Sequence, residues 1–407
     1  MNPRTSFSSL PPEIVTKICR DSGLRRKDLV ALRLTSKSQG IHLSASKALA
    51  TLCFKNINLV YTRYSLQAFA DICKHPVYGP AVRTVSLSYA RFVPDSFEEE
   101  SKDLLNHIER DEWSQGRHKY LENIRLLVNR CDEEEDLKRS GDGKDLLATA
   151  FAALSQWQHP LEIAASSTEF GAIGRSQIYS PYELSIYAHW ECDILGTVGL
   201  LCDAAVRASC AVQALEIEGV VWDNLVDSSS DSLSSLAQLS ELKLDIWPGG
   251  DVDILQVAGL DGMASKLLEN AVHLKTLYLR SDHIDDNTKF VRKICSRMSK
   301  MNLETITLVW IDLDEFKPFK NQIESLRYLE LLHCKIDGSL KNVLLSIQKN
   351  FPRLEYLRLS GISRAWTSKE IELKGVQGVS EGIDKLMQSR QNRYNDPEAE
   401  VWDSDED

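Results

Sequence analysis

Six segments in the second half of the chain share one spacing of apolar residues. An apolar position is followed by a second one three residues later and by a third two residues after that. The middle positions of successive segments are 23 to 35 residues apart, and the segments are residues 212–217, 239–244, 274–279, 303–308, 326–331 and 354–359. Amphipathic stretches with helical periodicity, at residues 144–157, 195–209 and 256–270, precede a related segment at 160–163 and the segments at 212–217 and 274–279. A unit of this kind cannot bury its apolar face alone, so we expect the units to stack into an array.

The length and spacing of these units resemble leucine-rich repeats, which span about 20–29 residues each. The asparagine of well-formed repeats is missing, and Cys334 lies near its position in one unit. The repeats are therefore irregular. We predict a mixed α and β fold, in which a small three-helix module is followed by an irregular leucine-rich-repeat-like solenoid of alternating helices and parallel strands.

Changes in composition divide the chain into five expected parts. They are a helical module at residues 7–50, a linker with a first strand–helix–strand unit at 51–94, a partly disordered acidic helical insertion at 95–143, the repeat domain at 144–375, and a C-terminal helix with a disordered acidic tail at 376–407. Residues 396–407 hold seven acidic side chains and no basic one, a composition that favours disorder.

Charge and cysteine usage restrict the class of protein. The net charge is −11, yet residues 1–83 carry 13 Lys and Arg against 4 Asp and Glu. A basic module on an acidic body indicates either an acidic partner or an ordinary surface imbalance, and it argues against nucleic-acid binding. No apolar run is long enough for a membrane span, and no secretory signal is expected. Nine dispersed cysteines without a Cys-x-x-Cys pair favour a reducing compartment, the cytoplasm or the nucleus.

The N-terminal module is expected to contain three short helices. The first begins near Pro11, where a missing backbone N–H costs little, and ends at Gly23. Asp28 is expected to cap the second helix, and residues 36–49 supply the third. About 40 residues make a thin core, so such a module needs a partner or a neighbouring domain.

Two motifs in this module lie at the spacing found in F-box proteins. They are Leu10-Pro11-Pro12-Glu13-Ile14-Val15 and Asp28-Leu29-Val30-Ala31-Leu32-Arg33-Leu34-Thr35-Ser36-Lys37. The module therefore resembles the F-box family over about a tenth of the chain. The resemblance implies a three-helix fold that docks on the acidic adaptor subunit of an SCF-type ubiquitin ligase and, through it, on the cullin. The resemblance further implies that the adaptor is contacted by eight apolar residues of the module, namely Leu10, Pro11, Ile14, Val15, Ile18, Leu29, Leu32 and Leu34. The alternative is that these residues close the module's own core.

The repeat strands are the expected binding site for an unknown protein substrate. Side chains alternate along a strand, so the residues between the apolar positions face away from the core. Tyrosine and arginine often anchor protein interfaces. The predicted substrate-contacting residues are Lys243, Tyr278, Arg280, Glu330, Tyr356 and Arg358. The alternative is that they are ordinary polar positions on a half-exposed sheet.

The sequence offers little support for an enzyme. It lacks the glycine-rich phosphate loops and the Gly-x-Ser-x-Gly elbow of hydrolases, and His189 with Cys192 makes only half of a zinc site. We therefore expect no catalytic residue, metal or cofactor. The main prediction is a non-catalytic substrate receptor of a ubiquitin ligase. The alternative is a scaffold that uses the F-box without delivering substrates, and a hydrolase with a Cys or Ser nucleophile is a remote third.

Overall fold

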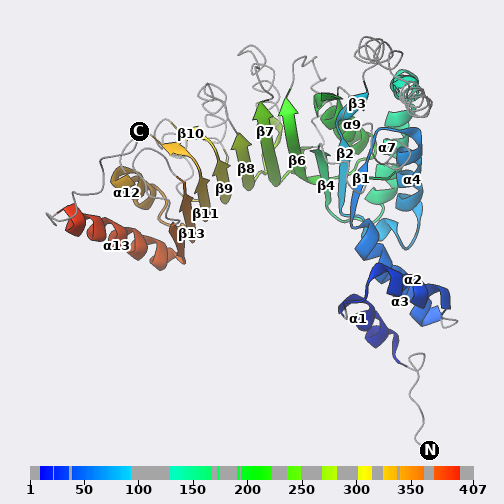
Figure 1. Cartoon of the computed structure of the whole chain (residues 1–407), viewed down its shortest axis with the longest axis horizontal. Coiled ribbons are helices and arrows are strands. Elements are labelled where there is room, and N and C mark those ends of the chain that lie inside the picture. Colours follow the sequence, from blue (N-terminus) through cyan, green and yellow to red (C-terminus); the bar gives the residue numbers. More distant parts are fainter. Residues whose placement is uncertain are drawn as a thin grey trace, which may run out of the picture. The chain divides into compact units, whose positions relative to one another are not determined.

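The computed structural model describes residues 10–21, 23–35, 39–92, 129, 131–166, 172–173, 190–192, 194–221, 236–248, 268–281, 301–313, 324–336, 340–361 and 371–394. The chain divides into two compact units (Figure 1), one made of Met1–Glu218 with Asp227–Leu236 and the other of Gly219–Val226 with Ala237–Asp407. The fold is mixed α and β with mostly parallel strands, so this part of the prediction is confirmed. It is compatible with an array of alternating helices and strands.

The first unit begins with a module of three helices: α1 (Pro12–Asp21), α2 (Arg26–Thr35) and α3 (Gln39–Phe54). Gly23 follows α1 with a φ of 68°, the left-handed conformation that ends helices and that glycine adopts most readily. Asp28 lies within the first turn of α2, where its carboxylate accepts a hydrogen bond from the Arg25 N–H at 3.0 Å. The expected cap position, before the start of the helix, is therefore wrong for Asp28. Its side chain instead reaches back to Arg25, the residue before α2.

Four parallel strands and three helices make up most of the rest of the first unit. Neighbouring strands follow the order β1 (Asn56–Leu59), β2 (Thr84–Ser88), β4 (Leu161–Ser166) and β6 (Val212–Val221). The helices are α4 (Arg63–Lys74), α7 (Asp142–Ser155) and α9 (Ile194–Arg207), and α7 packs between the other two. The helical turn η2 (Gly79–Ala81) and an antiparallel pair, β3 (Ala90–Phe92) with β5 (Trp190–Cys192), complete the unit.

Buried aromatic rings hold α4 and α7 together. Phe69 and Phe151 are fully buried and meet edge to face, with ring centroids 6.2 Å apart. Gly143, in the first turn of α7, lies so close to the ring of Tyr61 that any side chain at this position would overlap the tyrosine hydroxyl. Glycine at this position therefore allows the start of α7 to lie against Tyr61.

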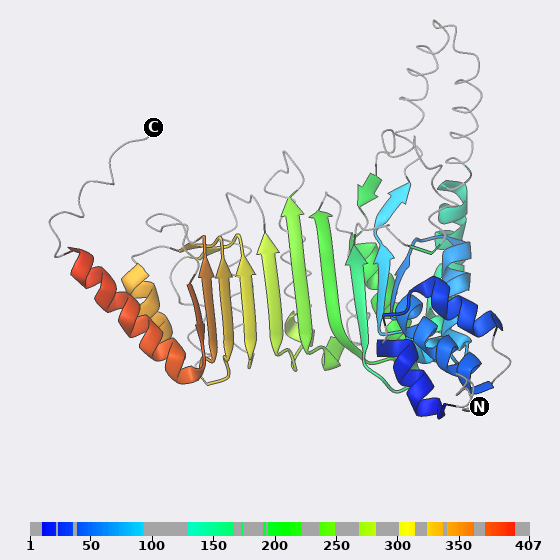
Figure 2. The same ribbon diagram turned by 60° about the horizontal axis from the view of Figure 1, so that its bottom comes forward.

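The second unit carries five parallel strands and one antiparallel strand (Figure 2). The parallel strands are β7 (Glu241–Pro248), β8 (Thr276–Ser281), β9 (Thr305–Val309), β11 (Tyr328–Leu332) and β13 (Tyr356–Ser360). The last strand, β14 (Ile371–Lys374), pairs antiparallel with β13. A short parallel pair joins β10 (Asp312–Leu313) to β12 (Lys335–Ile336). β14 is a difference from the all-parallel expectation.

In the second unit each repeat strand begins two residues after the first apolar position of its segment, whereas β6 begins at Val212 itself. Leu274, Leu303 and Leu354 lie in the turns ahead of β8, β9 and β13, and all three are buried. In a continuous strand this first leucine and the apolar residue three positions later would point to opposite faces. The turn before the strand removes this conflict, so that all three apolar positions of a segment reach the same core.

The turns ahead of the strands are joined by a repeated backbone contact. The Lys275 carbonyl accepts hydrogen bonds from the N–H groups of Glu304 and Thr305, at 2.8 and 3.0 Å. The same arrangement recurs from one turn to the next at the carbonyls of Ser240, Glu304 and Arg327, and in the first unit at Lys55. Each of these carbonyls accepts two hydrogen bonds from the next turn, and the repeated contact fixes the register of neighbouring strands.

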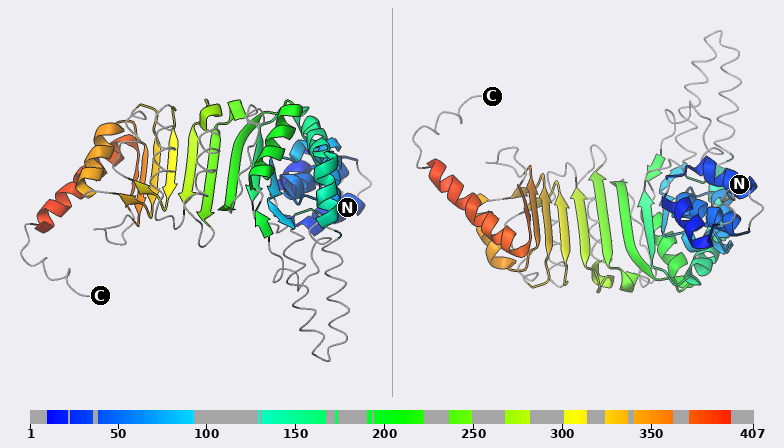
Figure 3. Two further views of the ribbon diagram at one scale, coloured as in Figure 1. Left: turned by 90° about the horizontal axis from the view of Figure 1, so that it is seen from above. Right: turned by 90° about the horizontal axis from the view of Figure 1, so that it is seen from below.

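Two helices lie at the C-terminal end of the second unit (Figure 3): α12 (Leu340–Asn350) and α13 (Val376–Tyr394). The Gln348 amide of α12 donates to the carboxylate of Asp384 in α13 at 3.0 Å. Residues 131–140 of the expected acidic insertion are helical, whereas residues 93–128 and the tail at 395–407 lie outside the described residues. Of the helix predicted at 256–270, only residues 268–270 are described, and they are helical.

Candidate interaction surfaces

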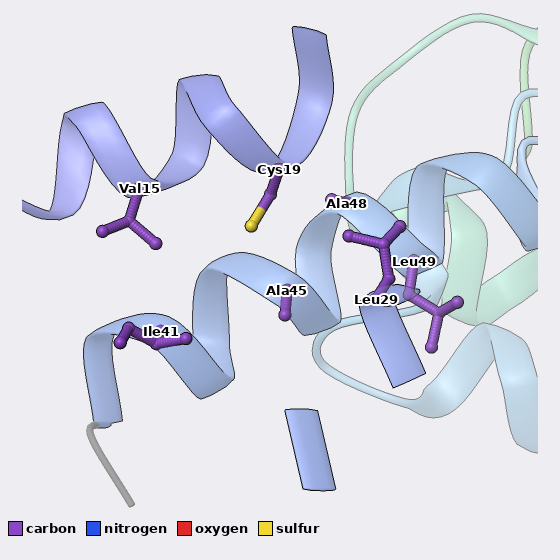
Figure 4. Packing of buried hydrophobic residues seen from close by; sticks show 7 residues of the cluster. All are labelled: Val15, Cys19, Leu29, Ile41, Ala45, Ala48 and Leu49. Carbon is purple, nitrogen blue, oxygen red and sulfur yellow. The ribbon is translucent and has the colours of Figure 1, made fainter. Parts of the chain in front are cut away.

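The three-helix module has a small core of its own (Figure 4). Val15 and Cys19 of α1 point toward Ile41 and Ala45 of α3, and Leu29 of α2 lies beside the far end of α3. The hydroxyls of Thr16 and Ser44 are 3.0 Å apart and tie α1 to α3. Much of α3's inward surface is alanine, so this core is thin, as the length of the module predicts.

The predicted adaptor-contacting residues divide into three groups. Val15 and Leu29 are fully buried in the module's core, where they cannot be reached without unfolding it. Leu10 and Leu32 are half-buried and pack against that core, and Ile18 is also half-buried. Three residues are exposed, namely Pro11, Ile14 at 45% and Leu34 at 77%. The structure therefore leaves these three as the accessible part of the predicted set.

Further apolar and basic side chains are exposed on the same module. Leu43 and Leu52 of α3 are exposed, although sequence reasoning did not select them. The basic residues Lys17, Arg20, Arg25, Arg26, Lys27 and Lys47 are exposed as well. Exposed apolar and basic side chains on one small module suit contact with an acidic partner.

The repeat face of the second unit is the side of its parallel strands that points away from the buried leucines. Four predicted substrate-contacting residues occupy one row across this face, because the strand register places Lys243, Tyr278, Glu330 and Arg358 at equivalent positions on β7, β8, β11 and β13. Arg280 lies in the next row along the strands, and Tyr356 in the row before. All six side chains are half-buried. The structure therefore brings the predicted set together.

The charged groups of the repeat face are paired with one another. The guanidinium of Arg280 lies 3.7 Å from the carboxylate of Asp245, and that of Arg358 lies 3.9 Å from the carboxylate of Glu330. The Thr307 hydroxyl also donates to Glu330, at 3.3 Å. Such part-exposed pairs hold side chains in place but contribute little to stability.

At β14 the tyrosine hydroxyl of the repeat face meets a carboxylate. Tyr356 donates to Glu372 at 3.1 Å, and the Lys374 ammonium lies 2.9 Å from the same carboxylate. Lys374 and Tyr356 together hold the pKa of Glu372 below its ordinary value. Desolvation raises the pKa of Tyr356 and that of Tyr278, with the neighbouring carboxylates of Glu372 and Asp245 adding to it.

An aromatic stack at the ends of β9 and β11 was not predicted. Trp310 and His333 directly follow these strands, and their rings stack with centroids 4.5 Å apart and planes 12° apart. Both have positive φ, 58° and 53°. Tryptophan does not predict left-handed backbone. Histidine is enriched among the non-glycine residues that adopt it, but this enrichment is too weak to predict the conformation at His333. Next to the stack, the Cys334 thiol donates to the Leu308 carbonyl at 3.4 Å, which connects adjacent repeats where asparagine was expected.

The described residues contain no arrangement suited to metal chemistry. Nowhere among them do three or more His, Cys, Asp or Glu side chains gather closely enough to hold a metal ion. Burial raises the pKa of the Cys73 and Cys210 thiols, and it raises that of Cys131 to about 11. The reactive thiolate is therefore disfavoured at these three positions.

Comparison with known proteins assigns no family, because no family model and no curated protein matches the chain. In the part of the chain that the structure describes, none of the helices combines the length and apolarity needed to cross a membrane.

Proposed function

We propose that this chain is the non-catalytic substrate-recognition subunit of an SCF-type ubiquitin ligase. The α1–α3 module docks on the adaptor subunit and, through it, on the cullin, and the repeat face recruits a protein substrate. Ubiquitin transfer takes place on partner subunits, so this chain contributes proximity and orientation. The cysteines among the described residues form no disulfide and most are buried, which suits the reducing conditions of the cytoplasm or nucleus.

The exposure of Ile14 and Leu34 carries this proposal. Both belong to the motifs that resemble an F-box, and both remain exposed although the module's core is short of apolar volume. Burying two such side chains in a partner stabilises a complex by roughly 1.5–3 kcal/mol each. The exposed basic residues of the same module would raise the rate of encounter with an acidic adaptor.

Binding of the purified adaptor subunit to the intact chain tests the docking step. The informative variant is Ile14→Asp, because an acidic residue is favourable in the first turn of α1 and leaves the helix intact. We expect the variant to weaken binding by roughly 30-fold or more, as for a hot-spot residue. The control is Leu345→Asp on α12, which changes an exposed residue (41%) of the second unit in the same way.

Two results would argue against the proposal. Either the intact chain fails to bind the adaptor, or Ile14→Asp binds as tightly as the unmodified chain. Reconstitution with cullin and a ubiquitin-conjugating enzyme then separates a receptor from a scaffold. A receptor directs ubiquitin onto a protein held by the repeat face, whereas a scaffold binds the adaptor without any such transfer.

A further inference from the structure

Equivalent residues follow three neighbouring strands of the second unit, and all three adopt left-handed backbone. Trp310, His333 and Gly361 come directly after β9, β11 and β13, with φ values of 58°, 53° and 61°. The Trp310 N–H donates to the Leu332 carbonyl at 2.9 Å, and the His333 N–H donates to the Ser360 carbonyl at 2.6 Å. The same backbone contact therefore joins neighbouring strand ends at Trp310 and at His333.

Only one of the three positions holds the residue that suits this backbone. Glycine adopts positive φ without steric cost, whereas a bulky side chain such as tryptophan is a genuine outlier there. Folding alone would favour glycine or asparagine at Trp310 as well. Strained residues of this kind concentrate at functional sites, which directs attention to what the Trp310 ring does.

Both residues of the stack are exposed, Trp310 by 47%. His333 lies between Trp310 and Gly361, since a side chain at Gly361 would overlap the imidazole. The indole of Trp310 is therefore the end of the stack away from Gly361. The 4.5 Å step from Trp310 to His333 is close to the separation of neighbouring strands, so one more ring can extend the stack at the same spacing.

We propose that Trp310, backed by His333, is the anchor point for an uncharged ring of the recruited protein, a proline or aromatic side chain. The choice of an uncharged ring follows from charge complementarity, because the nearby carboxylates of Asp245 and Glu330 already lie beside Arg280 and Arg358. Leu332, which ends β11 next to His333, is half-buried and adds apolar surface. Exposed tryptophans are frequent binding hot spots. The inference rests on the proposed function, since it specifies what the repeat face recruits.

A library of random twelve-residue peptides displayed on phage, selected on the immobilised full chain, tests this anchor. The informative variant is Trp310→Asn, because asparagine tolerates left-handed backbone and should leave the thermal midpoint unchanged or raise it. The control is Val272→Asn, which removes another exposed apolar residue (67%) of the same unit. We expect the selected peptides to carry proline or aromatic residues. Their affinity should fall at least about tenfold on Trp310→Asn and stay unchanged on Val272→Asn.

Three outcomes would overturn the inference. They are a selection without enriched peptides, enriched peptides without rings, and peptides that bind Trp310→Asn as tightly as the unmodified chain. A fall of more than about 5 °C in the thermal midpoint of Trp310→Asn, with peptide affinity unchanged, would assign the stack to folding. Adaptor binding is measured on the same proteins, and Trp310→Asn should retain it. Failure of the unmodified chain to bind the adaptor rejects the proposed ligase role alone.

Discussion

The strands of the two units share their pairing but differ in what their outer faces expose. In β2 and β4 most of the residues that point away from the helices are small, and Ser86, Ala164 and Ser166 are buried, although Glu162 at the start of β4 is exposed. In β11 and β13 burial alternates strictly, and the corresponding side chains are large and half-exposed, as at Glu330 and Arg358. A sheet face made of small residues serves packing, whereas one that presents long polar side chains is suited to recognition.

The largest expected effect is one that the two units share. Leu87 and Leu331 are both fully buried on the core side of their strands. Replacing either by alanine removes buried methyl groups and leaves a cavity, which should lower the free energy of unfolding by about 2–5 kcal/mol. Denaturant unfolding of each variant measures the loss. Similar values would confirm that the units differ only on their outer faces, and a loss under about 1 kcal/mol at either site would contradict it.

The outer faces themselves are compared by a matched pair of substitutions. Ser86→Tyr forces a large ring into the closed face, which is the outer face of β2 and β4 with its small buried residues. It also breaks the 3.0 Å contact between the Ser86 and Ser166 hydroxyls. We expect a loss of about 1–3 kcal/mol from overpacking. Thr307→Tyr places the same ring on the open face, which is the repeat face of the second unit. It should change the free energy of unfolding by no more than about 0.5 kcal/mol. Equal effects at the two sites, read from the same unfolding curves, would remove the distinction between closed and open faces.

A smaller effect is expected for the ion pair of the open face. Arg358 and Glu330 lie 3.9 Å apart and are partly exposed, so solvent screens their attraction. A double-mutant cycle with Arg358→Ala and Glu330→Ala should give a coupling of about 0.2–1 kcal/mol. Addition of 1 M salt should reduce it. A coupling above 2 kcal/mol would mean that this face is more sheltered than its half-buried side chains indicate.

The smallest effect concerns pH. The pKa of Glu372 is lowered by Lys374 and Tyr356, and that of Asp142 in the first unit is lowered by its hydrogen bond to Arg63. A lowered pKa in the folded state gives stability that is present above the ordinary carboxyl value and is lost as pH falls through the folded value. Glu372→Gln and Asp142→Asn should therefore flatten the acid limb of stability against pH slightly. The measurement is the unfolding midpoint between pH 7 and pH 3, where an unchanged limb would contradict the pairing.

Much of the repeat architecture follows from the sequence. The three apolar positions of each segment predict the strands of both units because side-chain alternation leaves few other ways to bury them. The same alternation predicts the row formed by Lys243, Tyr278, Glu330 and Arg358, which the register confirms as neighbours. Whether they contact a substrate stays a prediction.

Other features depend on information that one sequence does not display. The strand β14 has four residues, and only alternate positions are half-buried, so its apolar signal is weak. Val15 and Leu29 share the F-box-like motifs with Ile14, but only tertiary packing decides which of them the core absorbs. The Trp310 stack depends on backbone conformation that tryptophan does not favour, so no propensity reveals it.

The contacts between turns have a consequence for how such a chain can change over generations. Each turn is fastened to the next by two N–H groups on one carbonyl, and these donors belong to the backbone whatever side chains surround them. The spacing of equivalent positions on successive strands varies from 23 to 35 residues, yet the strands stay in register. Insertions and deletions between the strands therefore leave the pairing of the strands unchanged. Loops of new sequence can contact new partners while the sheet keeps its structure.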